Sequence, residues 1–155
     1  MSRVKRAVTF VPVSEYQPTE ESEGDYVDRL IVALHHPVPD RAGLAIDVLA
    51  YMLHEPRAVQ PLIELLHETE DMSILKQAVL ALGHLRDPQA IPPLIELLRD
   101  EDAPLVARHA AVEALAQIGG QAAEEGLRIA LAGPSAAIRK LAETKLAALR
   151  RGKGE

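Results

Sequence analysis

The sequence predicts an all-α fold, an α/α superhelix (solenoid) of about four helix pairs preceded by an extended N-terminal arm. Two observations lead to this prediction. The hexamer PLIELL occurs at residues 61–66 and again at residues 93–98, inside longer segments that also match. The chain is 48% hydrophobic, yet only 3% of its residues are aromatic. Apolar material of this kind, mostly Leu, Ala, Val and Ile, favours closely packed helices over a sheet sandwich.

Each copy of the repeat predicts two helices joined by an acidic turn. The segment RAVQPLIELLHETEDMSILKQAVLALGHLRD aligns with QAIPPLIELLRDEDAPLVARHAAVEALAQIGG. In the first copy Leu62, Leu65 and Leu66 are spaced i, i+3 and i+4, so they share one helical face. A helix pair of this size cannot bury that face alone, and stacked pairs share a continuous core.

The domain organisation follows from extending the repeat in both directions. Residues 1–24 do not fit it, and their β-branched run AVTFVPV and acidic SEYQPTEESEGD predict an extended arm and a linker. The repeat domain is expected at residues 25–150, with a basic tail at 151–155. Its units are expected at about residues 25–55, 56–87, 88–120 and 121–150.

Finer features of the units also follow from the alignment. The second helix of the first unit is expected to bury Ala45, Leu49 and Met52. The last unit carries Glu143 where the middle units carry valine, which is typical of a C-terminal capping repeat. Four residues are expected as N-caps of the second helices; these are Asp40, Ser73, Asp102 and Ser135.

Composition and charge exclude several classes of function. The chain has no cysteine, which excludes disulfides, thiol catalysis and cysteine-ligated metal sites. Residues 14–125 hold 21 acidic residues against 7 Lys and Arg, and so acidic a body repels a phosphate backbone. We therefore expect no nucleic-acid partner. The sequence contains neither a membrane-length apolar run nor a secretory signal, so we expect a cytoplasmic protein without a membrane partner.

Three segments carry a family resemblance: AVQPLIELL, AIPPLIELL and ARHAAVEALAQIG. They resemble the short HEAT-like repeats named after phycobilin lyases, and the resemblance covers about residues 26–150. It implies a solenoid whose second helices line the concave face. Because this repeat hosts many activities, the resemblance is specific for the fold and says little about function.

The resemblance, combined with helical spacing, implies which side chains point into the concave face. They form a mixed polar and apolar surface around a tyrosine, a residue type that often anchors interfaces. The alternative is that they are ordinary exposed helix residues without a partner. The predicted protein-binding residues are Leu44, Asp47, Tyr51, Lys76, Gln77, Leu80, His84, His109, Glu113 and Gln117.

Catalytic, metal and cofactor sites are not predicted. The six histidines show neither the H-x-x-x-H nor the H-E-x-x-H spacing of helical metal sites. The deoxyhypusine hydroxylases are similar in fold and hold iron through His-Glu pairs at the start of second helices. Here His109 precedes Ala110, Lys76 replaces the other histidine, and His54-Glu55 falls in a turn. The sequence also lacks a nucleophile set near a histidine.

The function predicted from these observations is a non-enzymatic protein-binding scaffold or adaptor, with another protein as its partner and no cofactor. The alternative is a phycobilin lyase-like or chaperone-like protein that handles a tetrapyrrole chromophore. A homo-oligomer formed through the N-terminal arm around Phe10 is a further prediction. The competing expectation for the arm is that Val8, Phe10 and Val11 pack on the first helix pair.

Overall fold

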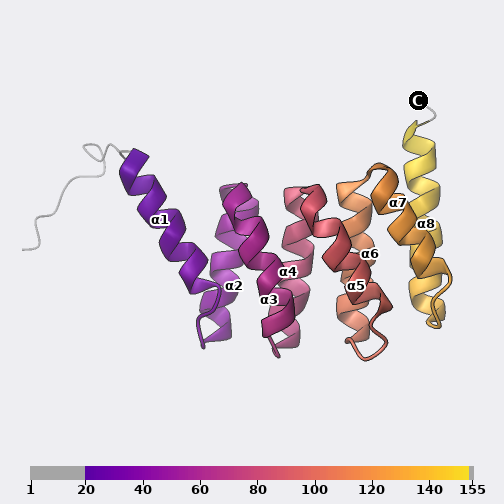
Figure 1. Cartoon of the computed structure of the whole chain (residues 1–155), viewed down its shortest axis with the longest axis horizontal. Coiled ribbons are helices and arrows are strands. Elements are labelled where there is room, and N and C mark those ends of the chain that lie inside the picture. Colours follow the sequence, from indigo (N-terminus) through magenta and orange to yellow (C-terminus); the bar gives the residue numbers. More distant parts are fainter. Residues whose placement is uncertain (1–19, 154–155) are drawn as a thin grey trace, which may run out of the picture.

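The computed structural model describes residues 20–153, and this part of the chain consists of helices joined by short turns, without strands (Figure 1). The predicted all-α fold is confirmed. The first two helix pairs comprise α1 (Glu20–Ala33), α2 (Pro39–Asp47) continued by a π-helical turn (Val48–Met52), a 3₁₀ turn (Pro56–Ala58), α3 (Val59–Glu68) and α4 (Met72–Leu85). The last two comprise a 3₁₀ turn (Pro88–Ala90), α5 (Ile91–Arg99), α6 (Leu105–Ile118), α7 (Gly120–Leu131) and α8 (Ala136–Lys153).

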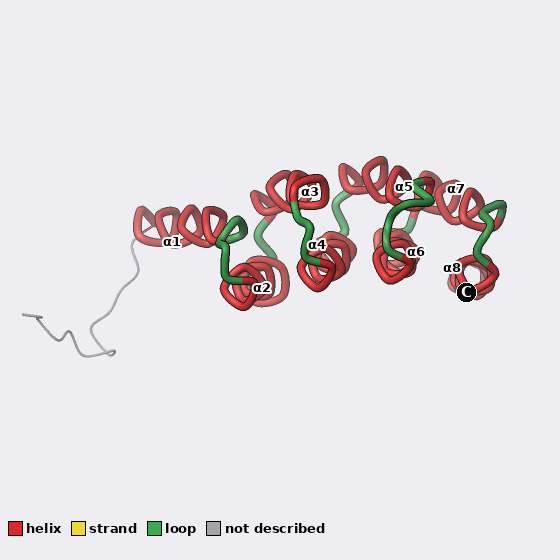
Figure 2. Tube along the Cα trace, turned by 90° about the horizontal axis from the view of Figure 1, so that it is seen from below, coloured by secondary structure: helices red, strands yellow, loops and turns green. Residues whose placement is uncertain are grey.

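The helices form two layers that run the length of an arched solenoid. The first helices of the pairs, α1, α3, α5 and α7, make up the outer layer, and α2, α4, α6 and α8 lie along the concave side (Figure 2). Within the concave layer α4 packs most extensively against α6. This arrangement places the second helices where the sequence predicts them.

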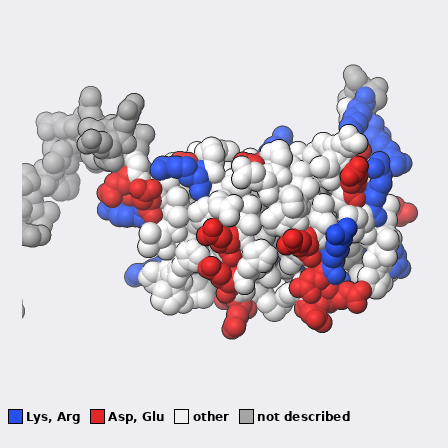
Figure 3. Space-filling model, in the orientation of Figure 1, with Lys and Arg blue, Asp and Glu red and all other residues white. Residues whose placement is uncertain are grey.

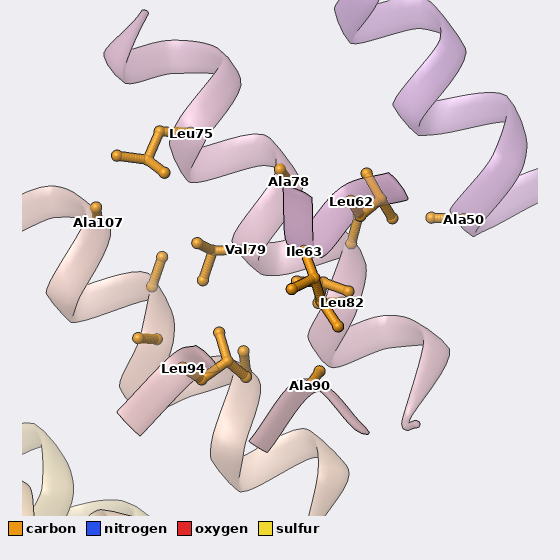
Figure 4. Close-up of a cluster of buried hydrophobic side chains, with 14 of the residues drawn as sticks. Ala50, Leu62, Ile63, Leu75, Ala78, Val79, Leu82, Ala90, Leu94 and Ala107 are labelled. Carbon is orange, nitrogen blue, oxygen red and sulfur yellow. The ribbon is translucent and has the colours of Figure 1, made fainter. Parts of the chain in front are cut away.

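The core lies between the two layers. The leucines that open the PLIELL motif, Leu62 and Leu94, are both 0% exposed. Figure 4 shows them with Leu82 and Val79 in one cluster of buried side chains from the second and third units. Burying a leucine fully stabilises the folded state by about 1.5–3 kcal/mol. The repeated hexamer therefore serves packing.

The boundaries of the repeat domain differ from those expected. Helix α1 begins at Glu20, inside the segment predicted to be arm and linker. An acidic sequence favours the start of a helix, because the helix dipole is positive there. At the other end α8 continues to Lys153, so most of the predicted basic tail is helical. The predicted extended arm, with Phe10, lies outside the described residues.

Three of the four expected N-caps are wrong. The carboxylate that caps α4 belongs to Asp71, which accepts hydrogen bonds from the backbone N–H groups of Ser73 at 2.9 Å and Ile74 at 3.0 Å. The N-caps of α2 and α6 are Val38 and Pro104, neither of which caps through its side chain. Pro39 opens α2, where its fixed φ suits a helix start and its missing N–H leaves one donor fewer for a cap to satisfy. At the start of α8, the Ser135 hydroxyl accepts from the Ile138 N–H as expected.

The last unit has a polar outer surface. Glu143 of α8 is exposed, whereas Val79 and Val112 at the equivalent positions are 0% exposed. Those valines face a following unit, and α8 has none to cover it within the described range. The buried Glu124 of α7 accepts a hydrogen bond from Lys153, which holds the pKa of that carboxyl below its usual range. The ion pair between Lys153 and Glu124 links the C-terminal end of α8 to α7.

Charged residues follow the edges of the outer layer. Figure 3 views this layer and shows acidic side chains gathered at the lower edge, where the turns after α3 and α5 lie, and basic side chains along α8. Among residues 20–153, no helix combines the length and the apolar character needed to cross a bilayer.

Candidate functional site

The ten predicted binding residues all lie on α2, its π-helical turn, α4 and α6, on the concave layer. Six are exposed to solvent; these are Leu44, Asp47, Tyr51, Lys76, His109 and Gln117. The other four are half-buried; these are Gln77, Leu80, His84 and Glu113. Leu80 packs against the core, so it contributes less free surface than its position in the repeat suggested.

A groove of about 310 Å³ runs between α2 and α4. Leu44, 64% exposed, forms one wall. Gln77 crosses the helix contact, and its Nε2 donates to the Gly43 carbonyl at 3.0 Å and to Asp47 Oδ1 at 2.8 Å. These bonds fix the side chains of Gln77 and Asp47, so the groove presents an ordered polar edge beside an apolar wall.

A second groove of about 320 Å³ lies between α4 and α6. Lys76, His109 and Glu113 provide its polar groups. The imidazole of His109 lies 4.0 Å from the Glu113 carboxylate one turn further along α6. An exposed pair at this distance stabilises the fold little, and both groups stay available to a partner.

The floor and rim of the second groove contain two residues that the sequence prediction missed. Leu105 and Val106, in the first turn of α6, are 48% and 47% exposed. The signal was present in the alignment, because the fourth unit has only Ala136 and Ala137 at these positions. The comparison of the repeats gave these two residues no role, and the solenoid leaves both exposed to solvent.

Aromatic rings meet at the C-terminal ends of α2 and α4. The ring centroids of Tyr51 and His84 lie 4.5 Å apart, and those of His54 and His84 lie 5.0 Å apart. Burial raises the pKa of the Tyr51 hydroxyl, and the nearby Asp47 carboxylate adds to this effect. Sequence reasoning assigned His54 to a turn without a role, because nothing in the repeat indicates that the turn folds back onto α4.

The π-helical turn explains how these rings come together. The Leu53 N–H donates to the Val48 carbonyl, five residues earlier, at 2.9 Å. The wider turn shifts the helical register, so Met52 is 74% exposed instead of buried as predicted. Insertions of this kind are frequent at functional sites. Here the turn presents Tyr51 to the concave side and directs the chain toward His84.

Together, the two layers and the mixed apolar and polar inner face define a helical repeat scaffold. Comparison with known families agrees: residues 27–110 match HEAT repeats, and residues 107–133 match the PBS lyase HEAT-like repeat. The chain belongs to the HEAT-repeat family, with repeats of the PBS-lyase type. No curated protein matches the chain significantly.

Proposed function

We propose that this protein is a non-enzymatic scaffold or adaptor that binds another protein on its concave face. The observation that carries the proposal is the position of its exposed apolar side chains. Leu44, Leu105 and Val106 line the two grooves of the concave layer, and Met72, 56% exposed, opens α4 of the same layer. Exposed apolar groups gathered beside polar ones are typical of protein interaction sites.

The shape of the grooves supports a polypeptide partner. Both are open to solvent and about the size needed to accept a few side chains, with polar groups at their edges. Protein interfaces have this anatomy, with apolar anchors at the centre and a polar rim. Asp47 and Glu113 lie at the edges together with Lys76, so the face offers ion-pair partners of both signs.

The test is affinity purification of the tagged chain followed by mass spectrometry. The variant Leu44→Ser with Leu105→Ser removes an apolar wall from each groove without touching the core. The matched control is Val32→Ser, which removes a 75% exposed valine from the outer layer. We expect the partner to be retained by wild type and by the control, and to fall at least about tenfold with the double variant, which corresponds to about 1.4 kcal/mol of binding free energy. Equal retention by all three proteins would contradict concave-face binding.

A second candidate function is the handling of a tetrapyrrole chromophore, as a phycobilin lyase or a chaperone. The match of residues 107–133 to the PBS lyase HEAT-like repeat supports it. Tyr26 and Tyr51 are the aromatic residues of the described range, so the face offers few rings against which a bilin could stack. Visible absorbance that co-purifies with the chain from a pigment-producing host would favour this candidate over the scaffold.

A further inference from the structure

Two histidines from different units converge at one end of the concave layer. His54 follows the π-helical turn of the first unit, and His84 lies in the last turn of α4 in the second unit. Their Nε2 atoms are 3.1 Å apart. His54 is exposed and His84 is half-buried, so the pair is accessible from solvent.

The backbone and a neighbouring ring hold both imidazoles in place. His54 has a φ of 51°, a left-handed conformation that costs energy for a residue other than glycine. The adjacent hydrogen bond from the Glu55 N–H to the Leu49 carbonyl, at 2.9 Å, closes this turn. Tyr51 packs against the His84 ring. The two nitrogens are therefore brought together by the fold of both units.

We propose that His54 and His84 bind one divalent transition-metal ion, of the zinc, nickel or copper class, through their Nε2 atoms. Metal–nitrogen bonds of about 2.0–2.1 Å to two nitrogens at this separation give an N–metal–N angle of about 100°, between the octahedral and tetrahedral values. Residues 20–153 contain no group of three or more His, Cys, Asp or Glu side chains arranged as metal ligands. Water completes the coordination, and the ion joins the first unit to the second.

The chemistry of the donors selects this class of ion. Imidazole nitrogen binds zinc, nickel and copper well, whereas magnesium and calcium prefer oxygen ligands. A second pair, His35 Nδ1 and a Glu68 carboxylate oxygen at 3.1 Å, joins the same two units at the opposite ends of their helices. It offers only one imidazole, so we assign the ion to His54 and His84.

Isothermal titration of the full chain with zinc chloride tests the assignment. We expect one ion per chain, with affinity reduced at least tenfold in both His54→Gln and His84→Gln. His35→Gln is the matched control and should bind zinc like wild type. Magnesium chloride should give no binding heat.

Two outcomes would overturn the proposal. Wild type without measurable zinc binding would mean that the two imidazoles share only a hydrogen bond. Zinc binding that survives His54→Gln or His84→Gln but is lost in His35→Gln would move the site to the other pair. Nitrogen-15 spectra of the wild-type imidazoles provide a check that needs no variant, since zinc should shift the Nε2 signals of His54 and His84 together and leave those of His35 unchanged.

Discussion

The contact between α4 and α6 and the contact between α2 and α4 join successive units by different means. In the α4–α6 contact, Gly83 lies so close to α6 that an added Cβ would be 2.6 Å from Ala114 Cα. In the α2–α4 contact, the same test at Gly43 meets the end of a flexible side chain, Gln77 Oε1, at 2.8 Å. One contact is backbone against backbone, and the other is mediated by a polar side chain.

The difference shows how one repeat supports both packing and recognition. In the α4–α6 contact the helices touch directly at Gly83. The exposed apolar groups Leu105 and Val106 lie in the first turn of α6, away from that contact point. Where Gln77 spaces the helices, exposed groups follow the length of α2, from Leu44 to Tyr51. Both kinds of contact therefore leave accessible side chains on the concave face.

The largest expected effect is at the close contact. Gly83→Ala should destabilise the protein by about 1–3 kcal/mol, because overpacking a helix contact forces the backbones apart. Gly24→Ala is the control, since an added Cβ there meets nothing within 4 Å and alanine gains up to about 1 kcal/mol of helix propensity. Urea unfolding followed by circular dichroism measures both. If Gly83→Ala were as stable as wild type, the two contacts would not differ as described.

The polar contact should respond to loss of its side chain. Gln77→Ala removes the hydrogen bonds to Gly43 and Asp47 and should cost about 1 kcal/mol. A double-mutant cycle with Asp47→Ala isolates the bond between the two side chains, and we expect a coupling of about 0.5 kcal/mol or more. Additive effects of the two substitutions would show that this bond contributes nothing to the free energy of unfolding.

Gly43→Ala should change stability far less than Gly83→Ala. The new methyl group displaces Gln77 and weakens its bond to the Gly43 carbonyl. Alanine recovers about 0.5–1 kcal/mol of helix propensity, so the net change should lie within about 0.5 kcal/mol of zero. The same urea titration measures it. A loss as large as that of Gly83→Ala would mean that Gln77 cannot move aside.

The fold could be predicted from the sequence because the residues that repeat are those that pack in the core. Leu62 and Leu94 are copies, and each is fully buried at the same place in its unit. The predicted site residues could be placed on the concave layer for the same reason, since helical spacing fixes the face once the repeat is aligned.

What the sequence could not predict depends on local backbone events. The π-helical turn adds one residue to the end of α2 and exposes Met52, although Met52 aligns with the partly buried Leu85. The same turn brings His54 to His84. The bonds that close the turn, from the Leu53 N–H to the Val48 carbonyl and from the Glu55 N–H to the Leu49 carbonyl, join backbone groups and leave no mark on the side-chain pattern of the repeat. The cap of α4 is Asp71 and not Ser73 for a similar reason. Both residue types can cap a helix, and the path of the turn decides which of them does so.

The smallest expected effect concerns the Tyr51 hydroxyl in the α2–α4 contact. Burial, and secondly Asp47, raise its pKa in the folded state. At alkaline pH the unfolded chain loses this proton first, so the unfolded state binds fewer protons than the folded one and stability falls as pH rises. The loss begins at the usual pKa of tyrosine and is complete above the raised value. Tyr51 is 41% exposed, so solvent screening keeps the effect small.

We expect wild type to lose more stability than Tyr51→Phe between pH 9 and pH 11 in urea titrations, and Asp47→Asn to reduce that difference. Equal losses in wild type and Tyr51→Phe would show that the hydroxyl is as well solvated in the folded protein as in the unfolded chain.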